Sequence, residues 1–143
     1  MNWRKAAAPM LALTVHGVLA AALAAQTGGV TRTFNTSLER AWTVTESVLK
    51  SLGWEIDKRD RDVGWILTNS RGVEFKDFGV YGDGTRHKLR LTLKAVGEGK
   101  TLVSVERELY KEERILWMRE KKPLETKDRG VETAVLDAIA KAL

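Results

Sequence analysis

Cysteine is absent from this chain of 143 residues, and histidine and proline occur only twice each. Without cysteine, the chain cannot form disulfides, supply a thiolate nucleophile, or bind zinc or iron–sulfur clusters through sulfur. Two prolines leave no proline-rich linker, and the length suits one domain rather than several. With 43% apolar and 30% charged residues, the composition is that of a folded globular protein.

The start of the chain has the pattern of an export signal. Arg4 and Lys5 form a short basic start, and residues 6–25 then carry no charge. Their apolar core spans about fifteen residues, as in signal peptides, and ends in the cleavage-type sequence Ala22-Leu23-Ala24. We therefore expect residues 1–25 to be a signal peptide that directs the protein to the periplasm.

A retained anchor in the inner membrane is the alternative interpretation. A spanning helix needs about 20 apolar residues, and residues 6–25 reach that length only by including Pro9, His16 and several alanines. Cleavage would remove Arg4 and Lys5 and lower the net charge from +5 to +3. This excess is too small for a typical nucleic-acid-binding face, so no nucleic-acid partner is expected.

The rest of the chain predicts one domain over residues 30–143. Some segments alternate polar and apolar residues as strands do, and two have the apolar spacing of helices. The first helix is expected to begin at a capping box of Thr36 and Glu39 and to end at Gly53. The expected strands are residues 30–34, 54–60, 65–69, 86–95 and 101–109, and a second helix carries the apolar stripe Val131, Ala134, Val135, Ala138 and Ile139.

The strand at residues 86–95 indicates how the layers are arranged. Leu89, Leu91 and Leu93 alternate with polar residues, so one face of the strand is buried and the other is solvated. This predicts a two-layer α+β fold, in which an antiparallel sheet of four to five strands curls around the C-terminal helix beside an additional N-terminal helix. Residues 70–86 are expected to be a long glycine-rich connection, and residues 110–129 fit neither period.

Several short stretches together suggest a resemblance to a known family. They are Phe34, Ala41-Trp42, Leu49-x-x-Leu52-Gly53-Trp54-x-Ile56, Asp60-x-x-x-Gly64-Trp65-Ile66-x-Thr68, Glu132 and Leu136. In this order they resemble the helix-grip domains of envelope proteins, in particular the lipoprotein C subunit of the outer-membrane β-barrel assembly machine. The resemblance implies a helix-grip fold and supplies no catalytic residue.

The sequence predicts no enzyme activity and no cofactor. His87 lies between Arg86 and Lys88, which lower its basicity, and no nucleophile motif accompanies it. We expect it to be a solvated histidine at the edge of the domain. Asp77-Phe78-Gly79 matches a kinase triplet, but the other kinase motifs are missing.

Phosphate and metal sites are not predicted either. The glycines at 79, 82 and 84 precede a strand rather than a helix, which favours hairpin turns over a phosphate-binding loop. Asp57, Asp60 and Asp62 are interleaved with basic residues and lack the spacing of a calcium loop.

Two segments are candidates for binding a partner. Phe75, Phe78 and Tyr81 recur every three residues in the glycine-rich connection, which either folds over the core or meets a partner. The second segment is basic, and it is either a solvated face or an interface, where tryptophan and arginine are enriched. Its candidate residues are Lys111, Arg114, Trp117, Met118, Arg119, Lys121 and Lys122.

These observations predict a non-enzymatic module that binds or helps to assemble other components of the cell envelope. The expected partner is another envelope protein, with contact to an anionic envelope surface as a further expectation. The alternative is a binding module for an apolar or amphiphilic small molecule, held between the sheet and the C-terminal helix. The large inward-facing residues favour the first interpretation.

Overall fold

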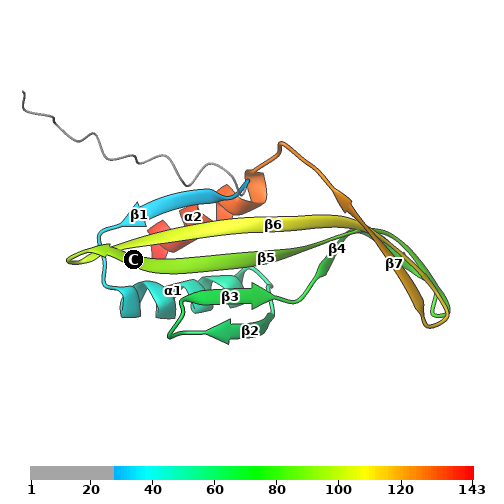
Figure 1. Ribbon diagram of the computed structural model, residues 1–143, viewed down its shortest axis with the longest axis horizontal. Helices are drawn as coiled ribbons and strands as arrows, with labels where there is room; N and C mark the ends of the chain where they lie inside the picture. Colours follow the sequence, from blue (N-terminus) through cyan, green and yellow to red (C-terminus); the bar gives the residue numbers. More distant parts are fainter. Residues whose placement is uncertain (1–27) are drawn as a thin grey trace, which may run out of the picture.

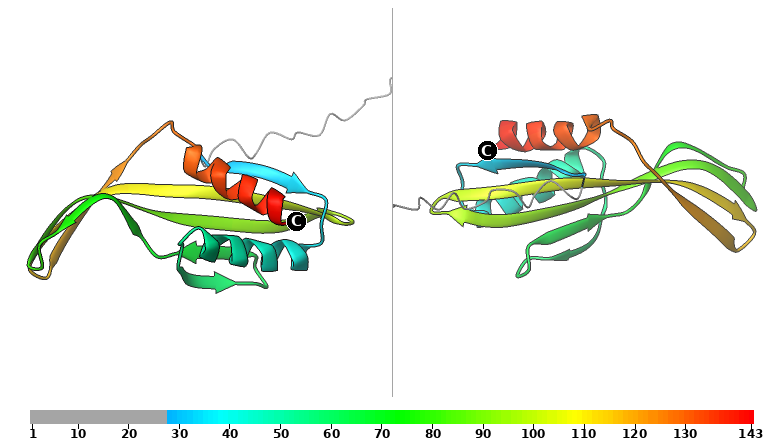
Figure 2. Two further views of the ribbon diagram at one scale, coloured as in Figure 1. Left: turned by 180° about the vertical axis from the view of Figure 1, so that it is seen from behind. Right: turned by 45° about the horizontal axis from the view of Figure 1, so that its top comes forward.

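The computed structural model describes residues 28–143, which form a seven-stranded antiparallel sheet with two helices on one face (Figures 1 and 2). The elements are β1 (Val30–Phe34), α1 (Leu38–Ser51), β2 (Ile56–Asp60), β3 (Trp65–Thr68), β4 (Arg71–Asp77), β5 (Tyr81–Gly97), β6 (Lys100–Ile115), β7 (Met118–Leu124) and α2 (Gly130–Ala142). The predicted α+β class is confirmed, with more strands than the four or five expected. The expected signal peptide, residues 1–25, lies outside the described residues.

The hairpin of β5 and β6 runs the length of the molecule. These strands have 17 and 16 residues and pair from Gly97–Lys100 to Tyr81–Ile115. In one half of the molecule the strand order is β1-β6-β5-β3-β2, and in the other half β4 and β7 flank the same hairpin. We call the first half, with both helices, the body, and the second half, residues 71–86 and 110–124, the arm (Figure 1).

The core of the body lies between the sheet and the helices. Leu89, Leu91, Leu93, Val103 and Val105 are buried, so the predicted inward face is confirmed. Helix α1 packs against α2 and β5, and α2 packs against β6 and β1 (Figure 2). The buried residues of α1 are Ala41, Trp42, Thr45, Val48 and Leu49, and those of α2 are Glu132, Val135, Leu136 and Ile139.

The two ends of α1 can be compared with the helix ends predicted from the sequence. The N-cap is Ser37, whose hydroxyl oxygen accepts from the Arg40 amide at 3.3 Å, so the capping box expected at Thr36 is wrong by one residue. Gly53 has φ of +80°, which confirms the expected left-handed stop after the helix.

In the arm, the expectation for residues 70–86 is wrong, and residues 110–129, which fitted neither period, are largely strand. Residues 70–86 are not a connection that folds over the core, because β4 and the first part of β5 form a hairpin there. Residues 110–129 hold the end of β6 and all of β7, which pairs with it from Leu109–Leu124 to Ile115–Met118. Pro123 fits because β7 is an edge strand in the arm.

A buried charged group fixes the start of α2. The Glu132 side chain is almost fully buried, and its carboxylate lies 3.8 Å from Arg107 Nε and 3.9 Å from Arg129 Nη1. Arg107 is itself buried and donates to the backbone oxygen of Asp128 at 3.2 Å. This cluster joins β6 to the helix and to the segment that precedes it.

No helix in residues 28–143 combines the length and the hydrophobicity that crossing a membrane requires.

Candidate docking surface on the arm

The far end of the arm gathers exposed apolar side chains from two adjacent turns. The β4–β5 turn and the β6–β7 turn lie beside each other because β5 and β6 are paired up to Tyr81 and Ile115. Trp117 is 83% exposed. We call the exposed apolar residues at this end the tip: Phe78, Val80, Tyr81, Ile115, Leu116, Trp117 and Met118.

One hydrogen bond joins the two turns of the tip, and another closes the β4–β5 turn. The Leu116 amide donates to the Val80 oxygen at 2.6 Å, and the Phe78 amide donates to the Tyr81 oxygen at 2.7 Å. The rings of Phe78 and Tyr81 stack with their centroids 6.1 Å apart. The tip is therefore an ordered surface with two turns in a fixed relation.

Leu116 adopts a backbone conformation that glycine would adopt more easily. Its φ is +54°, and it is the one residue other than glycine with positive φ among residues 28–143. An L-residue in this region costs roughly 1–2 kcal/mol. The sequence thus keeps an exposed apolar side chain at a turn position where glycine would relieve the strain, and such outliers often occur at functional sites.

Arg114 connects the tip to the strands behind it. Its Nη2 donates to the Asp77 carboxylate and to the Gly79 oxygen at 2.9 Å. The hydrogen bond from the Gly79 amide and the one from Arg114 lower the pKa of Asp77. The acid nearest the β4–β5 turn is therefore charged and paired.

Behind the tip, one face of the arm has a hollow of about 280 Å³. The Phe75 ring, which lines it, packs over Gly82 so closely that a Cβ on Gly82 would lie 2.8 Å from the ring. We call this surface the arm hollow. Its lining residues are Ser70, Phe75, Asp77, Arg86, Tyr110, Glu112, Arg114, Arg119 and Lys121.

Charged and aromatic groups alternate in the arm hollow. Glu112 is buried and lies 3.4 Å from Arg86 and 3.9 Å from Arg119. The Arg86 guanidinium lies over the Phe75 ring at 4.9 Å, and the Lys121 ammonium lies over the Tyr110 ring at 5.0 Å. This arrangement of arginine and aromatic side chains suits a protein interface better than a reaction centre.

The structure brings most of the predicted partner-binding residues onto the arm's tip or hollow. Phe78, Tyr81, Trp117 and Met118 belong to the tip, and Phe75, Arg114, Arg119 and Lys121 line the hollow. The two others, Lys111 and Lys122, point to the opposite face of the arm, where they lie 3.9 Å from Asp83 and 3.4 Å from Glu120. They are therefore apart from both surfaces.

Sequence reasoning missed three residues at the tip and five in the hollow: Val80, Ile115 and Leu116, and Ser70, Asp77, Arg86, Tyr110 and Glu112. The strand predicted at residues 101–109 continues through residue 115, and this extension sets the register across the arm. Residues 111–114 are all charged, so the sequence offers no polar–apolar alternation there as a signal.

His87 is not the solvated edge residue that the sequence predicted. It is 6% exposed, and its ring packs on Trp54 with the centroids 4.8 Å apart. Burial lowers its pKa to about 4, helped by the positive charges of Arg107 and Arg71. The expected direction is right, but the cause lies in burial and in residues distant in sequence.

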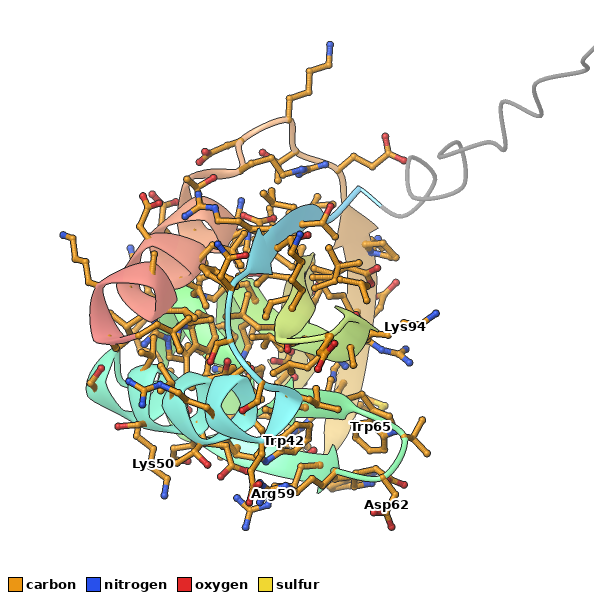
Figure 3. All side chains as sticks on the ribbon, turned by 90° about the vertical axis from the view of Figure 1, so that its left-hand side faces the viewer. Trp42, Lys50, Arg59, Asp62, Trp65 and Lys94 are labelled. Carbon is orange, nitrogen blue, oxygen red and sulfur yellow. The ribbon has the colours of Figure 1, made fainter. Side chains whose placement is uncertain are left out.

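Figure 3 views the body from the end opposite the tip. Lys50, Arg59, Asp62 and Lys94 point outward in this view, from α1, β2, the β2–β3 turn and β5. Arg59 also donates to Glu46 at 2.9 Å. Within residues 28–143, no three histidine, aspartate or glutamate side chains come together as a metal site requires.

Comparison with known proteins gives no family for this chain. No family model matches the sequence, and no curated protein matches it. Among solved structures, the adenylate sensor of AMP-activated protein kinase, in complex with 5-aminoimidazole-4-carboxamide ribofuranotide, is similar with a TM-score of 0.47 and 12% identity. The match covers 78% of this chain and 92% of that one.

Proposed function

We propose that this chain is a non-enzymatic interaction module of the cell envelope, and that the arm supplies its docking surfaces. The observation behind this proposal is the tip, which gathers seven exposed apolar side chains at the end of the arm. Exposed apolar patches of this kind usually mark binding surfaces. Neither helix covers this end of the hairpin (Figure 2).

The arm hollow is the surface proposed for a partner protein. It combines arginines with aromatic rings, and Arg119 reaches over it with more than half of its side chain exposed. Arginine and aromatic residues are enriched where proteins bind each other. The helix-grip arrangement and the resemblance to the lipoprotein C subunit belong to this proposal as expectations.

The packing of the body favours this function over the alternative of a small-molecule carrier. Among the described residues, Leu91, Val103 and Leu136 are fully buried between the sheet and the helices. These side chains fill the space in which the alternative would place its ligand.

A photo-crosslinking amino acid at position 119 tests the proposal in the cells that make the protein. We expect a discrete adduct with an envelope protein, because this position borders the arm hollow. The control places the same group at Val63, which is 73% exposed in the turn between β2 and β3. Equal adducts from both positions, or none from position 119, would contradict an arm-directed module.

A further inference from the structure

We propose that the tip inserts into the interfacial layer of a lipid bilayer. This inference rests on the proposed function, because it names what the tip of the same arm contacts. The tip would then attach the protein to the membrane, and the arm hollow and the body would remain outside the lipid.

The side chains of the tip have the chemistry of the membrane interface. Trp117 and Tyr81 have an apolar ring with one polar group, the type of side chain enriched where a membrane meets water. Leu116, Val80 and Met118 around them are purely apolar and exposed. Inserted, these residues would leave water without burying a charge.

Several backbone groups of the tip are hydrogen-bonded within the protein, which lowers the cost of moving them from water into lipid. In lipid, an unpaired amide or carbonyl group costs several kcal/mol. The Leu116 and Phe78 amides donate within the tip, and the Gly79 amide donates to the Asp77 carboxylate at 2.9 Å. Arg114 donates to the Gly79 oxygen from behind the turn. These three amides and the Gly79 oxygen are thus paired inside the protein.

The shape of the tip favours lipid over a protein partner at this place. Cross-strand register puts Tyr81, Ile115 and Met118 on one face of the sheet, while Phe78 and Trp117 lie in the turns at its end. A stable protein interface covers roughly 800 Å² on each partner. The rigid surface of a partner protein would contact only one side of this narrow end. A bilayer surrounds the end from all sides.

The arm carries charges of both signs behind the tip, eight basic and six acidic residues within residues 71–86 and 110–124, so its net charge is only +2. Asp77 pairs with Arg114, Asp83 lies 3.9 Å from Lys111, and Glu120 lies 3.4 Å from Lys122. Such a mixed collar suits headgroups that carry charges of both signs. Insertion should therefore depend mainly on apolar contact with the lipid, and only weakly on salt concentration or on anionic lipid.

The absence of cysteine allows a direct test with the full chain. Val80→Cys and Val63→Cys each create one labelling site for an environment-sensitive fluorophore, and the two valines are 66% and 73% exposed. With phosphatidylcholine vesicles, the label at position 80 should brighten and shift to shorter wavelength, while the label at position 63 should not. Residues 1–27 are identical in both variants, so membrane binding by that segment would affect both equally.

A second substitution ties the signal to the tip. Trp117→Ser in the Val80→Cys chain should lower the partition coefficient about tenfold, because a large ring no longer enters the lipid. No brightening at position 80, or equal brightening at position 63, would overturn the inference. A signal that requires anionic lipid and disappears in high salt would also overturn it, as would tip-dependent dimers seen by light scattering.

The two proposals fail in different ways. If position 80 ignores vesicles while position 119 still crosslinks to a protein, lipid insertion is wrong and the interaction module stands. If position 119 gives no adduct, the proposed function fails whatever the vesicles show.

Discussion

A buried histidine makes the stability of this protein sensitive to mild acid. The folded pKa of His87, about 4, lies below the ordinary value of 6.5. As pH falls, the unfolded chain therefore binds the proton first, and stability present above pH 6.5 is lost toward pH 4. Arg107 and Arg71 contribute because protonation would place a third positive charge near them.

The substitution His87→Phe tests this pH dependence. It keeps an aromatic ring beside Trp54 and removes the titrating group. Above pH 7, the unfolding free energy of the original protein minus that of the variant should be constant. As pH falls from 6.5 toward 4, this value should fall, because only the original protein carries the titrating histidine. Urea unfolding at a series of pH values measures it. Parallel curves over this range would show that His87 is not buried as a neutral base.

A second residue-scale prediction concerns Glu132. Glu132→Gln should destabilise the fold by about 3–5 kcal/mol, because it leaves the buried Arg107 without its opposite charge. Denaturant unfolding measures the loss. The matched control on the same helix is Asp137→Asn, which breaks an exposed pair with Arg32 and should cost less than about 1 kcal/mol. Similar losses from both variants would contradict the assigned role of the buried cluster.

At the scale of elements, the turn between β6 and β7 keeps an exposed apolar side chain at a cost in folding stability. Leu116→Gly should raise the unfolding free energy by about 1 kcal/mol, since glycine tolerates positive φ. Leu116→Ala keeps the strain and also removes the exposed side chain, so it should give no such gain. The midpoint of urea unfolding compares the two. If both variants stabilise equally, strain at this residue is not the cause.

Sequence periodicity predicted the elements of the body well because burial is one-sided there. Leu89, Leu91 and Leu93 alternate against solvated residues, and the buried stripe of α1 repeats at helical spacing. In α2 the stripe was partly misplaced, because the helix turns Glu132 inward toward Arg107 and leaves Ala134 exposed.

The arm was not predictable in this way because no helix layer covers either of its faces. Its strands are rich in charged residues, interrupted by glycines and single aromatic or apolar residues, and have no continuous apolar face. Gly82 and Gly84 resembled a loop, yet they allow β4 to approach β5, since a Cβ on Gly84 would lie 1.9 Å from the Glu74 oxygen. The sequence therefore named four of the seven tip residues and four of the nine residues that line the hollow, but not the strands that position them.

At the scale of the whole molecule, two continuous strands join regions of unequal stability. The body combines sheet, helices and a buried apolar core, whereas the arm is held by strand pairing and surface side chains. Local stability follows the amount of buried apolar contact. The arm should therefore open without unfolding of the body.

Amide hydrogen exchange of the whole chain tests this division. Amides of β4 and β7 should exchange through local opening, at rates at least tenfold faster than those of residues 89–93 and 103–105, which should require global unfolding. The boundary should fall within β5 and β6, near His87 and its cross-strand partner Leu109, where helix cover ends. Uniform protection along both strands would instead mean that the hairpin transmits the stability of the body to the tip, making the molecule one cooperative unit.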